Sequence, residues 1–171
     1  MSTDPPGIDP PGIDPPGVDP PGFELPLRLL LGFRVLLDEL HAELARQGHP
    51  QMRPMHGFVF QAIGPYGTTA AELGRRLGIS KQAAGKTIDT LERLGYLERG
   101  RDPADARRKI VLLTGRAIDA LERSALIFDG LRARWAATIG EERLRALEAD
   151  LRKVTPPEMF RLDMPGWFGD R

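Results

Sequence analysis

Residues 68–114 read TTAAELGRRLGISKQAAGKTIDTLERLGYLERGRDPADARRKIVLLT, and this stretch decides the fold. Thr69, followed three positions later by Glu72, forms a capping box, the pattern that starts a helix by satisfying its free backbone amides. Gly78 supplies the left-handed residue that lets this short helix stop, and Ser80 is placed to cap a second helix. The stretch therefore predicts a helix, a tight turn and a second helix.

The second helix, over residues 80–94, has two unlike sides. Ala84, Ile88 and Leu91 recur at helical spacing and are expected to face inward, whereas long polar side chains line the opposite side. Two short strands, at residues 96–99 and 109–113, follow the helix and are joined by a polar, basic loop. We therefore expect a winged helix, in a chain that is mainly α-helical with a small β-hairpin wing.

The winged helix has the physical properties that DNA binding requires. A helix that enters the major groove needs small residues for close approach and long polar residues at its N-terminal end for the base edges. The residues that fit this description are Ser80, Lys81, Gln82, Ala83 and Lys86. The alternative is a helical hairpin packed inside any globular domain, with charges that are only solvated.

The segments LGISKQAAGKTIDTLERLGYLER, DPADARR and LLT resemble the DNA-binding core of the multiple-antibiotic-resistance regulator (MarR) family of dimeric winged-helix repressors. The most specific piece is Asp105-Ala106-Arg107 ahead of Leu113-Thr114, which resembles the Asp-x-Arg wing signature of the family. In that signature the aspartate braces an arginine that enters the minor groove. The resemblance covers roughly residues 27–154. It implies that helix 80–94 reads the major groove and that wing 100–109 enters the minor groove. The residues expected to bind DNA are Thr69, Ser80, Lys81, Gln82, Ala83, Lys86, Thr87, Asp105, Arg107, Arg108 and Lys109.

Length and composition limit the remaining possibilities. With 171 residues, 41% hydrophobic and 28% charged, we expect one soluble domain in the cytoplasm. No apolar run approaches the roughly 18 to 20 residues of a membrane span, and the start of the chain lacks the features of a signal peptide. The absence of cysteine excludes disulfides, thiolate metal sites and a cysteine redox switch. We expect no cofactor and no membrane partner.

Helices on both sides of the winged helix are expected to form a dimerisation domain. Residues 23–67 contain a long helix from Pro26 that is apolar nearly all round, so that a second subunit is its natural cover, and a second helix that starts at Pro54. Residues 115–155 contain a helix capped by Thr114 and a final helix, and the resemblance implies that they interlock with the first helix of a partner. The expected dimer interface is Leu30, Phe33, Leu37, Leu144, Leu147 and Leu151. The tail at 156–171 carries large apolar residues and is expected to pack on this dimer.

The three histidines and the nucleophilic side chains are the remaining candidates for a metal site or a catalytic site. His41, His49 and His56, with Glu43, could form a metal site, but spacings of eight and seven residues match no known ligand pattern. We expect one turn histidine, two helix-packing histidines and no metal. There is no nucleophile–base–orienter set and no glycine-rich phosphate loop, so we expect no catalytic residue and no enzyme.

Three classes of function follow from these observations. The first is a homodimeric transcriptional regulator that binds an inverted repeat of double-stranded DNA. The resemblance implies that it is a repressor released by a small, often aromatic ligand, for which His56, Phe60 and Phe128 are the candidate pocket residues, although a core role is also open for both phenylalanines. The second class is a winged helix used as a protein-docking module. The third, an enzyme, needs a further domain.

The formal net charge of zero conceals a division of charge along the chain. Residues 1–22 repeat the unit DPPG[IVF] and carry four aspartates without a base, whereas residues 68–114 carry ten Lys and Arg against six Asp and Glu. The repeat is expected to form an extended acidic arm, with packing of its apolar residues on the body as the alternative. One hypothesis is that the arm competes with phosphates for the basic segment, and the other is that it is a spacer.

Deletion of residues 1–22 distinguishes these two hypotheses. If the arm competes with DNA, the deletion tightens binding to random DNA at low salt, because non-specific binding is almost wholly electrostatic. The gain shrinks as salt rises past roughly 0.15 M, where the Debye length falls to about 8 Å. The measurement is affinity against salt for the full chain and the deletion variant. Identical curves identify the arm as a spacer.

Overall fold

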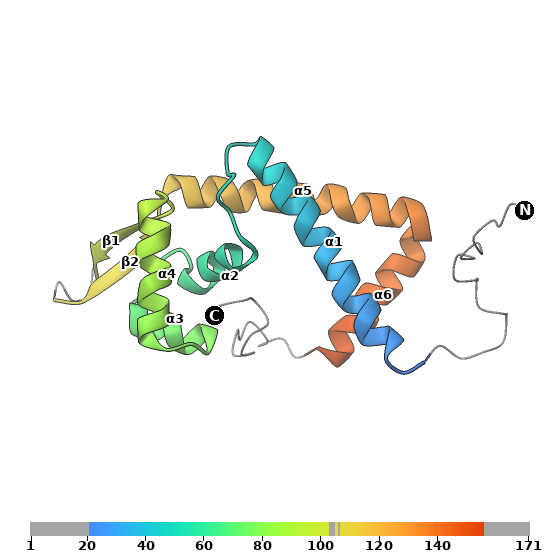
Figure 1. The fold of residues 1–171 in the computed structure, drawn as a ribbon, viewed down its shortest axis with the longest axis horizontal. Helices are drawn as coiled ribbons and strands as arrows, with labels where there is room; N and C mark the ends of the chain where they lie inside the picture. The colour runs from blue at the N-terminus through green and yellow to red at the C-terminus, as the bar shows by residue number, and fades with distance from the viewer. Residues whose placement is uncertain (1–20, 103–104, 106, 156–171) are drawn as a thin grey trace, which may run out of the picture. The chain divides into compact units, whose positions relative to one another are not determined.

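The computed structural model describes residues 21–102, 105 and 107–155 (Figure 1). The elements follow in the order α1 (Glu24–Arg46), α2 (Pro54–Ile63), α3 (Ala70–Leu77), α4 (Lys81–Arg93), β1 (Leu97–Arg101), β2 (Lys109–Leu113), α5 (Gly115–Ile139) and α6 (Glu141–Val154). This order confirms the expected mainly helical fold with a two-stranded hairpin. The acidic arm, apart from its last two residues, and the tail at 156–171 lie outside the described residues. None of the described helices has the length and apolarity that a membrane crossing requires.

Contacts divide the chain into two units, Met1–Arg34 and Val35–Arg171, with the division inside α1. In the first unit, α1 begins at Glu24, two residues before the predicted start, and Arg28 pairs with the Glu24 carboxylate one turn earlier at 3.0 Å. The apolar side chains of this part of α1 remain 41–45% exposed at Leu27, Leu29, Leu30, Leu31 and Phe33. In a single chain, the apolar surface of this part of α1 therefore remains exposed, as expected for a helix that a second subunit buries.

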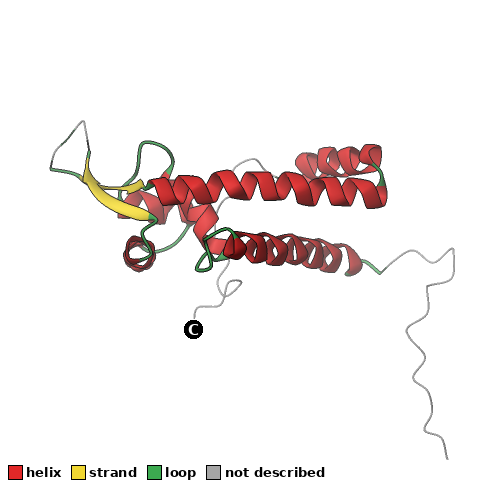
Figure 2. Ribbon diagram, turned by 90° about the horizontal axis from the view of Figure 1, so that it is seen from above, coloured by secondary structure: helices red, strands yellow, loops and turns green. Residues whose placement is uncertain are grey.

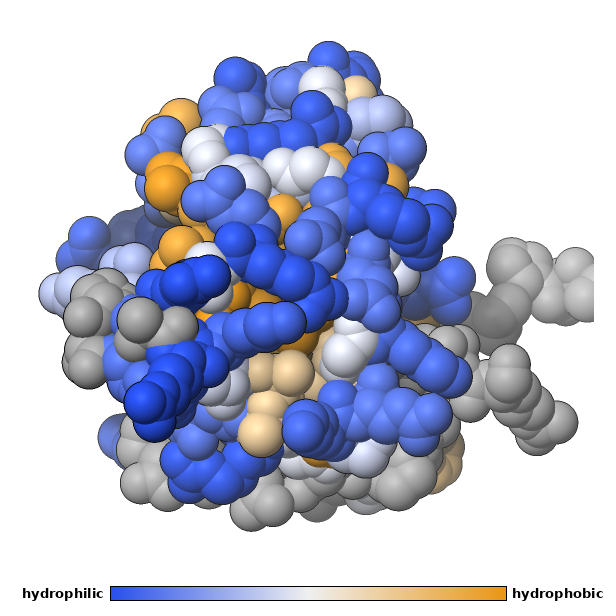
Figure 3. Space-filling model, turned by 90° about the vertical axis from the view of Figure 1, so that its left-hand side faces the viewer, coloured by the Kyte–Doolittle hydropathy of each residue, from blue (hydrophilic) through white to orange (hydrophobic). Residues whose placement is uncertain are grey.

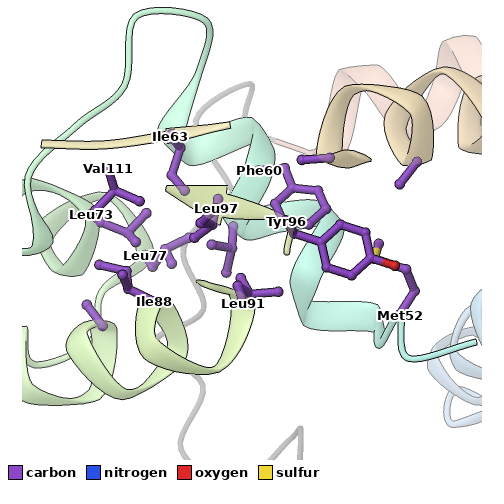
Figure 4. Packing of buried hydrophobic residues seen from close by; sticks show 14 of the residues in the cluster. Met52, Phe60, Ile63, Leu73, Leu77, Ile88, Leu91, Tyr96, Leu97 and Val111 are labelled. Carbon is purple, nitrogen blue, oxygen red and sulfur yellow. The ribbon is translucent and has the colours of Figure 1, made fainter. Parts of the chain in front are cut away.

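The second unit has its core where α2, α3, α4 and the hairpin meet. Side chains from these elements point toward one another around Phe60, Leu77 and Tyr96 (Figure 4). Ala84, Ile88 and Leu91 of α4 are each 0% exposed, which confirms that they face inward. Burial of this cluster holds α4 against the hairpin, so that the opposite side of α4 faces outward.

The hairpin is antiparallel, with Leu97 opposite Leu113 and Arg101 opposite Lys109. The prediction of the first strand ended two residues too early, because Gly100 and Arg101 also pair with β2. Thr68 forms a third, short pairing: its amide donates to the Val111 carbonyl at 3.0 Å and its carbonyl accepts from the Val111 amide at 2.7 Å. The segment before α3 is thereby fixed to the base of the wing.

Thr114 joins the hairpin to α5 with a single hydroxyl group. The Thr114 Oγ1 accepts the Ala117 amide at 3.4 Å as the predicted N-cap, and it also lies within hydrogen-bond distance of the carbonyl oxygens of Gly95, at 2.7 Å, and Tyr96, at 3.0 Å. In its C-terminal half, α5 runs beside α6 (Figure 2). Arg132 holds α6 there through ion pairs with Glu141 at 3.0 Å and Glu148 at 2.8 Å. The ends of α5 are thus fixed to different elements.

His56 lies in the first turn of α2 and must be neutral in the folded chain. Its Nδ1 accepts the backbone N–H of Arg53 at 3.2 Å, and the residue is 9% exposed. Burial lowers the pKa of His56 from 6.5 to about 4, with smaller contributions from the positive charges of Arg53 and His41. Protonation therefore costs free energy in the folded state.

We predict that His56 makes the fold less stable as pH falls from about 6.5 to about 4. The unfolded chain binds this proton near pH 6.5 and the folded chain binds it only near pH 4, so unfolding takes up a proton within this window. Between about pH 7 and pH 4.5 the wild type should lose roughly 1 to 3 kcal/mol more than His56→Gln, which keeps an acceptor but cannot be protonated. Urea unfolding at several pH values measures the difference. Parallel pH profiles for the two proteins contradict the prediction.

Candidate nucleic-acid interface

The first helix of the motif is capped as predicted, but the capping box is only half formed. Thr69 Oγ1 accepts the Glu72 amide at 3.2 Å. The Glu72 carboxylate, which the sequence placed on the Thr69 amide, instead accepts hydrogen bonds from Arg75 at 2.7 Å and Arg76 at 3.0 Å, and these bonds lower the pKa of Glu72. Thr69 is thus positioned at the start of α3, with its hydroxyl engaged in the cap.

The turn between α3 and α4 is close because two glycines allow it. Gly78 has φ +70°, the left-handed conformation that ends α3 as predicted. Gly74 lies against the turn itself, since a Cβ added there would sit 2.8 Å from the Ile79 carbonyl oxygen. Ser80 then caps α4, with its Oγ accepting the Ala83 amide at 3.1 Å. Local sequence signals are sufficient to place the start of α4.

The outer side of α4 carries the predicted contact residues. Ser80, Lys81, Gln82 and Lys86 are exposed, whereas Ala83 and Thr87 are half-buried. The Thr87 hydroxyl donates to the Ala83 carbonyl at 3.2 Å, so its hydrogen is engaged within the helix. The N-terminal half of α4 therefore offers long cationic and amide groups beside a small side chain, Ala83.

The tip of the hairpin is held by Asp105. Its carboxylate accepts the backbone N–H of Arg107 at 3.0 Å, and its own carbonyl accepts the Arg108 amide at 2.9 Å. Arg108 also lies 3.5 Å from the Asp102 carboxylate. The aspartate thus fixes the backbone of Arg107 and leaves the Arg107 side chain exposed.

Five exposed cations of α4 and the hairpin are available for a negatively charged partner. Within the residues that the structure describes, no ion pair or side-chain hydrogen bond is formed by Lys81, Lys86, Arg101, Arg107 or Lys109. The side of the molecule that carries the hairpin, α3 and α4 is mainly hydrophilic in Figure 3, with apolar side chains visible only between polar ones. These features suit a phosphate backbone.

Two groups of residues were missed by the sequence analysis. Arg99 of β1 bonds Glu92 at 2.9 Å and also Asp89, so it connects the wing to α4. The buried His49 ring bonds the Tyr96 hydroxyl at 3.0 Å and Asp119 at 2.8 Å. A carboxylate pair at i and i+3 near the C-terminal end of α4 was a usable signal for Arg99, whereas the partners of His49 lie too far away in the sequence to be inferred.

The three histidines lie in different surroundings. His41 Nδ1 donates to the Leu37 carbonyl within α1 at 2.6 Å, His49 lies in the turn after α1, and His56 is in α2. In the described part of the chain, no three His, Cys, Asp or Glu side chains are grouped so that they could hold a metal ion.

The candidate ligand-pocket residues differ in burial and lie outside two cavities of the structure. Phe60 is 0% exposed in the core, where its ring centre lies 5.6 Å from that of Tyr96, and Phe128 is 39% exposed on α5. A cavity of about 450 Å³ lies between α1 and α5, and another of about 700 Å³ lies beside the hairpin. Neither is lined by His56, Phe60 or Phe128.

The candidate dimer residues differ in exposure within one chain. Leu30, Phe33 and Leu147 are 45%, 41% and 41% exposed. Leu37 and Leu151 are half-buried, and Leu144 is buried in its own chain.

Comparison with known proteins agrees with this geometry. Residues 51–108, which contain α2, α3, α4 and β1 and end just before β2, match the model of the MarR family. The matched segment, about a third of the chain, is similar to the MarR family. This match confirms the resemblance that the sequence of the winged helix indicated.

A relative and two solved structures illustrate the likeness. The uncharacterized HTH-type transcriptional regulator YcgE of Bacillus subtilis (strain 168) is 41% identical over 54 residues, which are 32% of this chain and 34% of YcgE, so the match spans about a third of that relative. FabT of Streptococcus pneumoniae, solved in complex with DNA, has a TM-score of 0.64 at 17% identity over 77% of this chain and 93% of FabT. MepR of S. aureus, solved bound to ethidium bromide, has a TM-score of 0.55 at 20% identity over 77% of this chain and 93% of MepR. The two structures show a shared fold.

Substitution of two helical glycines by alanine tests the geometry of the motif. Gly74→Ala is expected to destabilise the fold by roughly 1 to 3 kcal/mol, because its Cβ meets a backbone carbonyl that is fixed by the turn. Gly85→Ala in α4 meets no atom within 4 Å and is expected to stabilise the fold by about 0.5 to 1 kcal/mol. Denaturant unfolding of both variants provides the measurement. Equal effects of the two substitutions would show that the α3–α4 turn is not tight.

Proposed function

We propose that this protein is a MarR-type homodimeric transcriptional repressor that reads an inverted-repeat operator. In this proposal residues 80–94 lie in the major groove and the wing at 100–109 lies in the minor groove. A small aromatic ligand releases the protein from DNA.

The observation that carries the proposal is the set of exposed cations on α4 and the wing that form no ion pair with the described part of the chain. Lys81 and Lys86 lie on the helix, and Arg107 and Lys109 lie on the hairpin, all exposed. Their charges lie on elements whose placement matches helix-in-groove and wing-in-groove docking. A chain with net charge zero binds DNA through such a local patch rather than through its total charge. FabT, which shares the fold, was solved with DNA.

The dimer is proposed from the exposed apolar side chains of α1 and α6. Leu30, Phe33 and Leu147 form the outer part of the proposed interface. Uncovered apolar surface of this kind is typical of interfaces between subunits. A two-fold dimer places two copies of α4 in successive major grooves, with half-site centres about 10 base pairs apart.

The ligand is proposed from the family and from MepR, which was solved with ethidium. His56, Phe60 and Phe128 remain the proposed pocket residues. Of these, Phe60 is fully buried and packs in the core.

The experiment that tests the function combines light scattering with selection of DNA by the purified protein. The expected outcome is a dimer at micromolar concentration and an enriched inverted repeat with half-site centres about 10 base pairs apart. A stable monomer contradicts the dimer. A protein-docking module enriches no sequence and tolerates the loss of Lys86 and Arg107.

Two hairpin variants separate minor-groove reading from phosphate binding. Arg107→Ala is expected to weaken operator binding by roughly 1 to 3 kcal/mol and to change the preference at flanking A·T positions, where a narrow minor groove attracts arginine. Lys109→Ala is the matched control, because it is also exposed and unpaired among the described residues, and it should weaken all sequences alike. Selected-sequence profiles of both variants provide the measurement. If the profile of Arg107→Ala overlays that of the wild type, Arg107 is only a phosphate contact.

A further inference from the structure

The second half of α4 carries negative charge close to the proposed DNA interface. Asp89 and Glu92 lie one turn apart, with side chains 61% and 38% exposed. Both follow the exposed cation Lys86 along the same helix. A free carboxylate at such a position repels phosphate and weakens binding.

Arg99 reaches both carboxylates from the neighbouring strand. Its Nε lies 2.9 Å from Glu92 Oε2, and its Nη2 bonds Asp89 Oδ1. The hydrogen bond to Glu92 is the largest cause of a raised pKa of Arg99, and the charges of Glu92 and Asp89 add to it. The Arg99 guanidinium therefore donates hydrogen bonds to two carboxylates of α4.

This contact joins the two elements that enter different grooves in the proposed function. Arg99 is in β1, opposite Val111 of β2, and its partners are in α4. The wing reaches its groove only if its angle to α4 is kept. A contact between the wing and α4 therefore affects how both elements bind DNA. The guanidinium is occupied by carboxylates and is less available for phosphate than Lys81 or Arg107, which are exposed and pair with none of the residues that the structure describes.

We propose that Arg99 is a positioning residue for DNA binding, which fixes the wing against α4 and neutralises Asp89 and Glu92 without contacting DNA. This inference rests on the proposed function. It predicts that the effect of Arg99 on affinity depends on the two carboxylates.

A double-mutant cycle tests this dependence. Arg99→Ala is expected to weaken operator binding roughly tenfold in the wild type. In a protein that already carries Asp89→Asn and Glu92→Gln, the same substitution should change affinity less than about twofold, because no bridge remains to be lost. Arg93→Ala is the matched control, since Arg93 is an exposed arginine of α4 that bonds only Thr90 among the described residues.

Salt dependence separates positioning from phosphate contact. Loss of a phosphate contact reduces the slope of log affinity against log salt by about 0.9 in magnitude. The slope measured for Arg99→Ala should differ from the wild-type slope by less than about half of that value. A loss near 0.9, or an equal cost of Arg99→Ala in both backgrounds, overturns the proposal and makes Arg99 a direct DNA ligand.

Hydrogen exchange in the absence of DNA tests the bridge by itself. Arg99→Ala should speed amide exchange of β1 and β2 several-fold, and Arg93→Ala should leave it unchanged. Unchanged exchange in Arg99→Ala overturns the positioning role. If the wild type binds no DNA, the proposed function fails and the role in DNA binding fails with it, while faster exchange in Arg99→Ala still establishes the bridge itself.

Discussion

The second unit depends on a hydrogen-bonded joint that consists of Tyr96, His49 and Asp119. This tyrosine is fully buried, and its hydroxyl lies 3.0 Å from Nδ1 of the buried His49, whose Nε2 lies 2.8 Å from Asp119. The distances fit a His49 ring whose Nδ1 accepts a hydrogen bond from the Tyr96 hydroxyl and whose Nε2–H donates one to the Asp119 carboxylate. Arg123 and then His49 hold the pKa of Asp119 at about 2, so this carboxylate is charged at neutral pH. The joint therefore connects the turn after α1, the root of the wing and α5 through hydrogen bonds.

Other contacts reinforce the same joint. The Arg116 guanidinium lies 4.8 Å from the centre of the Tyr96 ring and donates to the Gly48 carbonyl at 3.0 Å. Phe60 packs on another part of the ring. A large aromatic side chain with a polar end is suited to this place, since the ring fills the core while the hydroxyl reaches the histidine. The core and the polar contacts at its border are thus held by one residue.

The parts of the fold that the sequence predicted are those specified by near neighbours in the chain. Thr69, Gly78 and Ser80 mark the ends of α3 and α4 through interactions that span three or four residues, and Thr114 does the same for α5. The exposed face of α4 followed from the positions of its buried residues. The joint could not be predicted, because His49 and Asp119 are 70 residues apart and no local pattern relates them. The Arg99 bridge was also missed: the carboxylates of Asp89 and Glu92, at i and i+3, indicate a cationic partner, but the strand pattern does not identify Arg99 as that partner.

Thr114 has a mechanical consequence for the winged lobe. Its hydroxyl caps α5 and also lies within hydrogen-bond distance of two carbonyls at the root of the hairpin, so the first turn of α5 cannot rotate without carrying the hairpin or breaking these bonds. The 25 residues of α5 then form a lever about 37 Å long at 1.5 Å per residue. A shift of about 1 Å at Arg132, which holds α6 and lies about 27 Å along the helix from Thr114, corresponds to a tilt of about 2° at Thr114. A small displacement of α6 together with this part of α5 therefore changes the angle of the hairpin, because the Thr114 hydrogen bonds connect the hairpin to α5.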